Sequence, residues 1–258
     1  MIDIHSHILP AVDDGAVDLD MALDMASLYV ENGFKQVICT PHFMEDLDNF
    51  LPEENQKILN KLNEEISKAG LDLNLYLGNE VYISLSLLED LHKGKFSTLN
   101  NSKYILIELP MFNIPLYTED ILYELQVRGY IPIIAHPERN SKIIKDPNIL
   151  YNFVKDGALA QLNLPSLKGT YGDEIKDTTK VLLQHKLFHF VGTDAHSNGR
   201  LSPKVASVLK NLKDLVDEDY FHQLTKLNAK LLLENKDIIK SEPRKIEKKQ
   251  GFFRRLFR

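Results

Sequence analysis

The sequence has little cysteine and no long apolar run, and each shortage excludes a class of protein. Cys39 is the single cysteine among 258 residues, so an intrachain disulfide framework is excluded and a reducing compartment is favoured. No apolar run is long enough to cross a bilayer. The first residues also lack the basic and apolar regions of a secretory signal. These absences predict a cytoplasmic protein.

Basic residues are not in excess either. The chain has 31 lysines and arginines against 37 acidic residues, a formal net charge of −6. Nucleic-acid-binding proteins usually present a basic face, so this function is disfavoured. No glycine-rich phosphate loop follows a predicted strand, which argues against a nucleotide-binding open sheet. A length of 258 residues with 43% hydrophobic residues suits one globular α/β domain.

Seven short apolar runs alternate with amphipathic stretches. The expected strands are residues 2–7, 36–40, 73–77, 104–108, 131–135, 160–163 and 189–193. The expected helices are 18–32, 52–69, 118–128, 146–157, 174–185, one beginning at 202, and 218–233. This alternation is typical of parallel βαβ units, which close into a barrel or form an open sheet. The α/β domain is expected to span residues 1–235, followed by a short, flexible basic tail, residues 236–258.

Imidazoles and carboxylates collect where these strands end. His5 and His7 lie two apart on one strand, so both side chains point to the same face and can reach one ion. The other candidates at strand ends are His42, Glu80, Glu108, His136, Asp194 and His196. Any one of them could be a capping or surface residue, but their common placement predicts a metal site at the active face of a barrel. His92, His185, His189 and His222 lie on helices or within a strand and are expected to be structural.

The ligand types indicate the metal chemistry. Mixed histidine and carboxylate ligands suit manganese, iron or zinc. The candidates outnumber the ligands that one ion takes, which predicts a multinuclear cluster that activates water for attack at phosphorus. A phosphate also needs a cationic partner, and Arg139 and Arg200 follow His136 and His196 closely. A surface salt bridge is the alternative interpretation of each arginine.

Several segments resemble one known family. They are MIDIHSHILP, VDDG, TPH, GNE, YILIELP, IIAHPERN and TDAH. They are similar to the polymerase-and-histidinol-phosphatase (PHP) superfamily, and in particular to the bacterial manganese-dependent protein tyrosine phosphatases of capsule and exopolysaccharide gene clusters. The similarity runs from residue 1 to about 233, and the basic tail is similar too. The resemblance implies a distorted seven-stranded β/α barrel with three Mn²⁺ ions, iron or zinc being alternatives.

The resemblance also implies an assignment of ligands. The first ion would take His5, His7, Glu80 and Asp194; the second Glu80, Glu108 and His136; the third Asp14, His42 and His196. Asp13 is an alternative to Asp14. Arg139 and Arg200 match the family's phosphate-contacting arginines.

The implied activity is hydrolysis of phosphotyrosine on a protein by metal-activated water. The implied substrate is an autophosphorylating bacterial tyrosine kinase with a C-terminal tyrosine cluster, which helps to control polysaccharide export. No arginine stands six residues after Cys39, so the Cys-x5-Arg loop of the cysteine phosphatases is absent and Cys39 is expected in the core. Two alternatives stay open: a phosphoesterase acting on histidinol phosphate or another small molecule, and a metal-binding scaffold without catalysis.

Two smaller hypotheses concern apolar residues near the site and in the tail. Phe43, Met44, Met111 and Phe112 follow strands and are candidates to line an entrance for the phenyl ring, or simply to cover the barrel. Residues 251–258 interleave arginine with phenylalanine and leucine. This pattern predicts weak, peripheral contact with an anionic membrane surface, a solubilising tail being the alternative.

Overall fold

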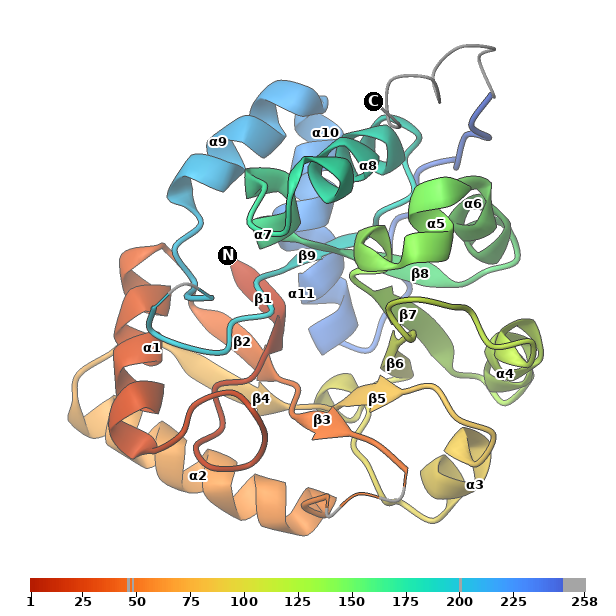
Figure 1. Cartoon of the computed structure of the whole chain (residues 1–258). Helices are drawn as coiled ribbons and strands as arrows, with labels where there is room; N and C mark the ends of the chain where they lie inside the picture. The colour runs from red at the N-terminus through yellow and green to blue at the C-terminus, as the bar shows by residue number, and fades with distance from the viewer. Residues whose placement is uncertain (46, 48, 200, 248–258) are drawn as a thin grey trace.

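The computed structural model of the chain describes residues 1–45, 47, 49–199 and 201–247. All the paired strands in these residues are parallel to each other. Figure 1 shows the strands in the centre with helices around them. The strands in the described residues are β1 (Ile2–Ser6), β2 (Gln36–Cys39), β3 (His42–Phe43), β4 (Asn74–Leu77), β5 (Glu80–Tyr82), β6 (Tyr104–Glu108), β7 (Ile131–Ala135), β8 (Leu159–Asn163) and β9 (Phe190–Gly192).

The helices match most of the predicted stretches. They are α1 (Leu19–Glu31), α2 (Pro52–Lys68), α3 (Leu87–His92), η1 (Leu99–Asn101), α4 (Thr118–Val127), η2 (Pro137–Arg139), α5 (Ser141–Lys145), α6 (Asn148–Lys155), α7 (Leu164–Lys168), α8 (Asp173–Gln184), α9 (Ala206–Leu215), α10 (Glu218–His222), η3 (Gln223–Leu227) and α11 (Asn228–Leu233). Asp18 caps α1 by accepting a hydrogen bond from the Met21 amide at 2.8 Å.

The predicted helix beginning at residue 202 starts four residues later, at Ala206. A helix over this segment would need the Val205 amide to donate to the Leu201 carbonyl. The Val205 amide instead donates to Asn32 Oδ1 at 3.1 Å. The Leu201 carbonyl accepts from the amides of His196 and Ser197. Tertiary hydrogen bonds therefore outcompete the first helical turn.

The strands form two sheets, of orders β1-β2-β4 and β3-β5-β6-β7-β8-β9. Each of the seven predicted runs contains a strand, but β3 and β5 were not predicted. They continue β2 and β4 after short breaks, at Thr40-Pro41 and at Gly78-Asn79. Proline cannot donate to a ladder, so β2 ends there and the chain joins the other sheet as β3.

The two sheets meet where β1 lies beside the end of β9. Ser6 bridges Ala195, and the Asp194 amide donates to the His5 carbonyl at 2.9 Å. The carboxylate of Asp3 on β1 accepts hydrogen bonds from the Thr193 amide and hydroxyl. The first and last strands are thereby joined, although residues far apart in the sequence form the seam.

The core has two layers because the central strands are buried on both faces. Alternate residues of β6 and β7 point into different layers. Tyr104, Leu106 and Ile133 belong to an inner hydrophobic cluster, whereas Ile105 and Ile134 belong to a larger outer one. The inner cluster also includes Ala229 and Leu232 of α11. Helix α11 therefore packs against the inner layer, next to β1.

Residues 236–247 extend along the body of the molecule. The Lys236 carbonyl accepts from the Tyr104 hydroxyl, and the Ile246 amide donates to Asn148 Oδ1 at 2.9 Å. Residues 251–258, for which membrane contact was predicted, lie outside the described residues.

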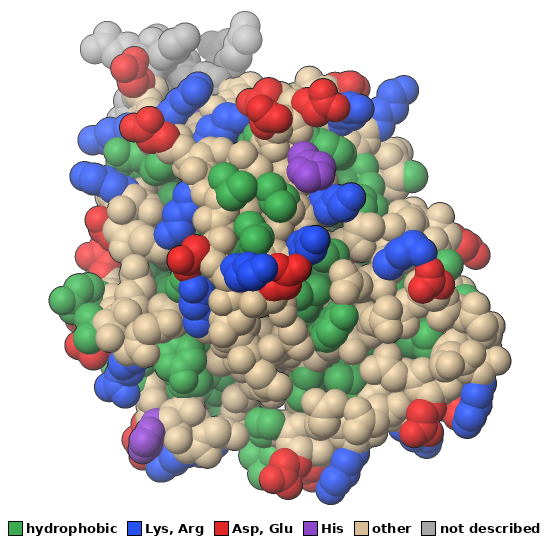
Figure 2. Space-filling view, turned by 180° about the vertical axis from the view of Figure 1, so that it is seen from behind, with side chains coloured by type: hydrophobic (Ala, Val, Ile, Leu, Met, Phe, Trp, Pro, Cys, Tyr) green, Lys and Arg blue, Asp and Glu red, His purple; other side chains and the backbone are tan. Residues whose placement is uncertain are grey.

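Two surface features bear on membranes and nucleic acids. No helix of the described chain has the length and apolar character needed to span a bilayer. On the face that Figure 2 shows, lysine and arginine side chains are interspersed with acidic ones. The charges described on that face do not form a continuous field of one sign.

Candidate metal centre

The predicted ligands lie together where the parallel strands end. His5 and His7 come from the end of β1, and Asp14 from the loop after it; the others are His42 on β3, Glu80 on β5, Glu108 on β6, His136 after β7, and Asp194 and His196 after β9. The ligand atoms of all but His136 form three groups, and within each group they lie within 4.8 Å of one another. The groups are His5, His7, Glu80 and Asp194; His42, Glu80 and Glu108; and His7, Asp14, His42 and His196.

The first group is buried and consists of atoms that accept hydrogen bonds. His5 Nε2 lies 3.2 Å from His7 Nε2. Glu80 Oε2 lies 3.1 and 3.3 Å from these two nitrogens. Asp194 Oδ1 lies 3.3 and 3.4 Å from them. This is the set predicted for the first ion.

The outer nitrogen of each imidazole fixes which tautomer faces the centre. His5 Nδ1 lies 3.0 Å from Gln161 Oε1, and His7 Nδ1 lies 2.7 Å from Asp13 Oδ2. The Gln161 amide is oriented by the Leu162 carbonyl, which accepts from its Nε2. Both oxygens accept, so both Nδ1 atoms donate and both Nε2 lone pairs point inward.

Two carboxylate oxygens and two imidazole lone pairs that lie this close together are stabilised by a positive charge between them. Burial lowers the pKa of His5, but Glu80 and Asp194 outweigh burial and raise it to about 9. Two carboxylates thus draw protons onto imidazoles that are otherwise oriented to present lone pairs. A divalent cation satisfies all four atoms at once, so the residues present fit a metal ion.

Glu80 links the first group to the second. Its Oε2 lies 3.2 Å from His42 Nδ1, and both buried atoms lack a hydrogen-bond partner among the described residues. Burial and the neighbouring Glu80 raise the pKa of Glu108 to about 8. Two adjacent carboxylates and an unpartnered imidazole nitrogen again fit a cation. His136, predicted to share this ion, contacts Glu80 Oε1 at 2.8 Å through Nε2.

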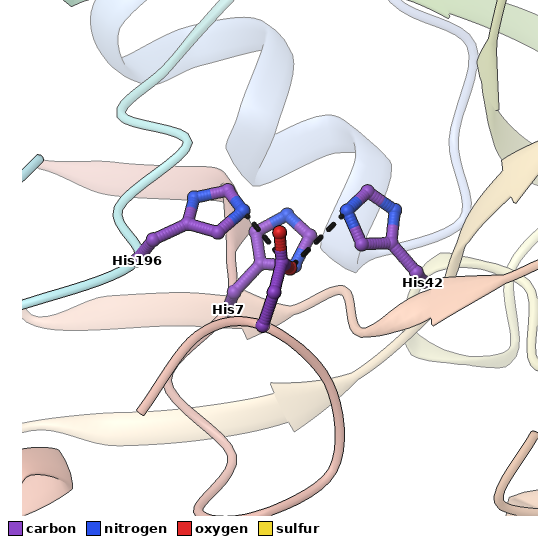
Figure 3. A group of neighbouring side chains, drawn as sticks. His7, His42 and His196 are labelled. Carbon is purple, nitrogen blue, oxygen red and sulfur yellow. Dashed lines mark ion pairs between the residues drawn. The ribbon is translucent and has the colours of Figure 1, made fainter. Parts of the chain in front are cut away.

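The third group is the most accessible one. Figure 3 shows His7, His42 and His196 pointing toward one another from three segments of the chain. Asp14 Oδ1 lies 3.5 Å from His42 Nε2 and 3.4 Å from His196 Nε2, and the Asp14 side chain is 70% exposed. The predicted third set was Asp14, His42 and His196. The structure adds His7, which belongs to two groups.

Asp13 and Asp14 differ in what they contact. Asp13 Oδ2 accepts from His7 Nδ1 and from the His42 amide at 3.0 Å, and its Oδ1 accepts from the Gly15 amide. Burial raises the pKa of Asp13, but His7 outweighs burial and lowers it to about 2. Gly15 allows this tight loop, because a Cβ there would lie 2.0 Å from the His7 carbonyl oxygen. Asp13 orients the ligands, and Asp14 faces the centre.

Two candidate ligands adopt backbone conformations that are rare outside glycine. His136 has φ = 31° and Asp194 has φ = 51°. Such residues store strain that is characteristic of functional sites, of order 1–3 kcal/mol each. Both stand directly after a strand or one residue beyond, where a sharp change of direction turns the side chain toward the cluster.

Of the two predicted arginines, Arg139 lies at the cluster. Its Nη1 donates to Asp194 Oδ2 at 2.8 Å, and its guanidinium carbon lies 4.6 Å from the centroid of the Tyr171 ring. Asn163 Nδ2 donates to the same Asp194 oxygen at 2.9 Å. Arg200 lies outside the described residues.

Sequence reasoning missed Gln161, Asn163 and Tyr171. A signal for the first two was present: Gln161 and Asn163 are polar residues two apart in a strand whose residues are all buried. That spacing puts both on one face, beside each other. Tyr171 lies beyond α7 and had no local signal.

The remaining candidates behave as core or surface residues. Burial raises the pKa of the Cys39 thiol, which disfavours a thiolate nucleophile. Burial lowers the pKa of His189 to about 3, and its Nδ1 accepts from the Ala160 amide, so it is a neutral core histidine. Of the predicted entrance residues, Phe43 is buried in the core, whereas Phe112 is 84% exposed.

Comparison with known proteins gives three close relationships. The chain is 38% identical over 255 residues to the tyrosine-protein phosphatase YwqE of Bacillus subtilis, covering 98% of this chain and 100% of that protein. It is 36% identical over 257 residues to the putative tyrosine-protein phosphatase CapC of Staphylococcus aureus, covering 98% and 99%. A solved structure is described among crystal structures of YwqE from Bacillus subtilis and CpsB from Streptococcus pneumoniae, unique metal-dependent tyrosine phosphatases. It superposes with a TM-score of 0.92 at 37% identity, covering 96% of this chain and 100% of that chain.

The family model described as "Capsular polysaccharide synthesis, CpsB/CapC" matches residues 1–234. The match spans every candidate ligand, and the relatives are alike over nearly their whole length. The resemblance inferred from the motifs is thereby confirmed. The chain belongs to the CpsB/CapC family of capsular polysaccharide synthesis.

Proposed function

We propose that this chain is a metal-dependent protein-tyrosine phosphatase that hydrolyses phosphotyrosine on a protein substrate. The observation that carries the proposal is the buried convergence of two imidazole lone pairs and two carboxylates in the first group. Membership of the CpsB/CapC family supports the reaction class, since the relatives are named as tyrosine-protein phosphatases.

Three metal ions, with Mn²⁺ preferred and iron or zinc as alternatives, suit the ligands. His5, His7, Glu80 and Asp194 would hold the first; Glu80, Glu108 and His136 the second; and Asp14, His42 and His196 the third. Bound there, divalent ions would lower the pKa of a water molecule and neutralise phosphate oxygens. The separation of Asp13 from Asp14 by their contacts supports Asp14 as the ligand.

The other residues orient charge around the phosphate. Asp13 and Gln161 keep the imidazoles of His7 and His5 in the tautomers that bind metal. Arg139, held by Asp194 and covered by Tyr171, supplies a planar cation beside the cluster, and Arg200 is the second proposed phosphate contact. The phenolate of tyrosine is a fairly good leaving group, so no general acid is assigned.

The fold and the domain boundary complete the proposal. Joining of β1 to the end of β9 supports counting the two sheets as one distorted seven-stranded barrel, in which β2 continues as β3 and β4 as β5. Residues 1–235 would form this catalytic body and residues 236–258 an appended tail. The proposed location is the cytoplasm, with weak membrane contact through the tail.

The proposed substrate is an autophosphorylating tyrosine kinase with a C-terminal tyrosine cluster, in a pathway of capsule or exopolysaccharide synthesis. The family description of capsular polysaccharide synthesis supports this setting. A protein substrate also suits the open third group, where Asp14 is 70% exposed. Phosphotyrosine there would reach the cluster from solvent.

The first test is turnover of a phosphotyrosine peptide by metal-stripped protein, with Mn²⁺, Zn²⁺, Mg²⁺ or nothing added back. We expect Mn²⁺ to restore activity. His136→Ala should lose at least about 100-fold, because it removes a proposed ligand and a neighbour of Glu80. Bound metal is counted by mass spectrometry in parallel. His92→Ala is the matched control, since His92 lies exposed on α3.

Three outcomes would contradict the proposal in different ways. Turnover of histidinol phosphate without turnover of the peptide would assign the small-molecule alternative. Stoichiometric metal binding without turnover of either substrate would assign the scaffold alternative. Equal activity of His136→Ala and His92→Ala would place the reaction elsewhere on the protein.

A further inference from the structure

Three large apolar side chains are exposed on the loops that follow β5 and β6. Leu85 is 72% exposed, Phe112 is 84% exposed and Leu116 is fully exposed. We call them the rim patch. Isolated exposed apolar residues are common on protein surfaces, but a group of them beside a functional site is characteristic of recognition.

The two loops of the rim patch are joined to each other. The Ile83 amide donates to the Glu108 carbonyl at 3.0 Å, and the Tyr117 hydroxyl contacts the Ile83 carbonyl at 3.4 Å. Tyr117 is the neighbour of Leu116, and Ile83 stands two residues before Leu85. The loops that carry Leu85 and Leu116, 31 positions apart in the sequence, are therefore held together where β5 and β6 end.

The backbone that presents Phe112 is held in place. Asn140 Nδ2 donates to the carbonyls of Pro110, at 2.7 Å, and Asn113, at 3.0 Å. Ser141 donates twice, from its amide to the Met111 carbonyl and from its hydroxyl to the Phe112 carbonyl, both at 2.8 Å. A fixed exposed aromatic ring loses little conformational entropy when a partner covers it.

The same hydrogen bonds place the Phe112 backbone against the segment that follows Arg139. Ser141, whose hydroxyl donates to the Phe112 carbonyl, stands two residues after Arg139. Glu108, a proposed ligand, stands four residues before Phe112. Four extended residues span at most about 14 Å, so the Phe112 backbone lies within that distance of the Glu108 backbone. A peptide whose phosphotyrosine reaches the cluster covers the same distance with about four residues.

We propose that the rim patch binds apolar side chains that lie within a few residues of the phosphotyrosine in a protein substrate. Phe112 is the specificity-determining residue, because it is the aromatic member and its backbone is fixed on both sides. The proposal rests on the proposed phosphatase function and adds a feature of its substrate: an apolar or aromatic side chain within a few residues of the phosphotyrosine.

The test compares two phosphotyrosine peptides of equal length and charge. One carries leucine or phenylalanine on both sides of the phosphotyrosine, and the other carries serine at those positions. We expect the wild-type protein with Mn²⁺ to prefer the apolar peptide by about tenfold in kcat/KM, mainly through KM. Phe112→Ala should reduce this preference to near one. Because the ratio compares two substrates on one preparation, it does not depend on the amount of folded protein.

Tyr123→Ala is the matched control, since Tyr123 is a 65% exposed aromatic residue on α4, outside the rim patch. It should keep the wild-type preference. Absence of a preference in the wild type, or a preference unchanged in Phe112→Ala, would overturn the proposal. A change of molecular mass in light scattering for Phe112→Ala would also overturn it, by assigning the patch to contact between copies of the chain. Failure of the proposed function is a separate result, in which the wild type hydrolyses neither peptide nor free phosphotyrosine.

Discussion

Neighbouring carboxylates serve different purposes at this site. Asp13 is enclosed by His7, His42 and Gly15, whereas Asp14 is mostly exposed and faces two imidazoles. The difference comes from the turn at Gly15, which brings the chain back against the His7 carbonyl. A carboxylate behind a ligand histidine raises its basicity and fixes its orientation.

We expect Asp13→Asn to weaken metal binding by about 10- to 100-fold, because an amide at this position cannot replace the charge that accepts from His7 Nδ1. Asp14→Asn should lower the number of ions bound and leave the first group intact. Both effects are measured by calorimetric titration of the metal-free protein with Mn²⁺. Asp20→Asn, on the first turn of α1, is the control. Wild-type affinity in Asp13→Asn would contradict the positioning role.

At the scale of elements, the seam between β1 and β9 depends on a buried carboxylate. Asp3 accepts from the His5 and Thr193 amides, from the Tyr29 hydroxyl at 2.8 Å and from the Thr193 hydroxyl at 2.5 Å. Burial raises the pKa of Asp3, although these hydrogen bonds oppose the shift. The seam positions His5 and Asp194, so its geometry sets that of the first group.

Thr193→Val should destabilise the protein by about 1–3 kcal/mol, because it leaves buried Asp3 short of a donor. Thr118→Val is a matched control, since the buried Thr118 hydroxyl has no hydrogen-bond partner in the part of the chain that the structure describes, and its loss should be nearly neutral. Urea unfolding of both metal-free variants measures the difference. Equal stabilities would show that the other donors to Asp3 suffice.

The main strands followed from local sequence, but their short continuations β3 and β5 did not. Continuous apolar residues of β6 and β7 predict strands buried on both faces, as observed. Strands β3 and β5 have only two and three residues, too few to show the alternation of side chains from which a strand is predicted. The start of α9 was also wrong in the prediction, because the Val205 amide has a partner on another element.

For the whole molecule, the cluster makes stability depend on pH when metal is removed. The pKa of His5 is raised from 6.5 to about 9 by Glu80 and Asp194 against the effect of burial, and that of Glu108 from 4.5 to about 8 by burial and Glu80. Both groups bind a proton more tightly in the folded protein than in the unfolded chain. This contribution is complete below the unfolded pKa values and is lost as pH rises through the folded ones.

We therefore expect the free energy of unfolding of the metal-free protein to fall by about 4 kcal/mol between pH 6.5 and 9. The lowered pKa values of Asp13 and Asp194 act only in acid and do not change the free energy of unfolding in this window. The lowered pKa values of His42, His136 and His189 oppose the fall by only about 0.4 kcal/mol each. Saturating Mn²⁺ should reduce the fall, because metal replaces the protons. Urea unfolding at pH 6.5, 7.5 and 9 measures it, and a stability that rises over this range without metal would contradict the prediction.

Sequence alone determined the alternation of the seven main strands with helices, the ligand types and their position at strand ends, because alternation and the spacing of His5 and His7 are local properties. Family membership followed from the same short motifs. Tertiary structure decided which atoms share a group, that His7 belongs to two groups, and that Asp13 supports while Asp14 faces the centre. Those outcomes depend on contacts between distant residues, such as His5 with Gln161, 156 positions away. Local periodicity holds no information about such pairs, and folding alone brings them together.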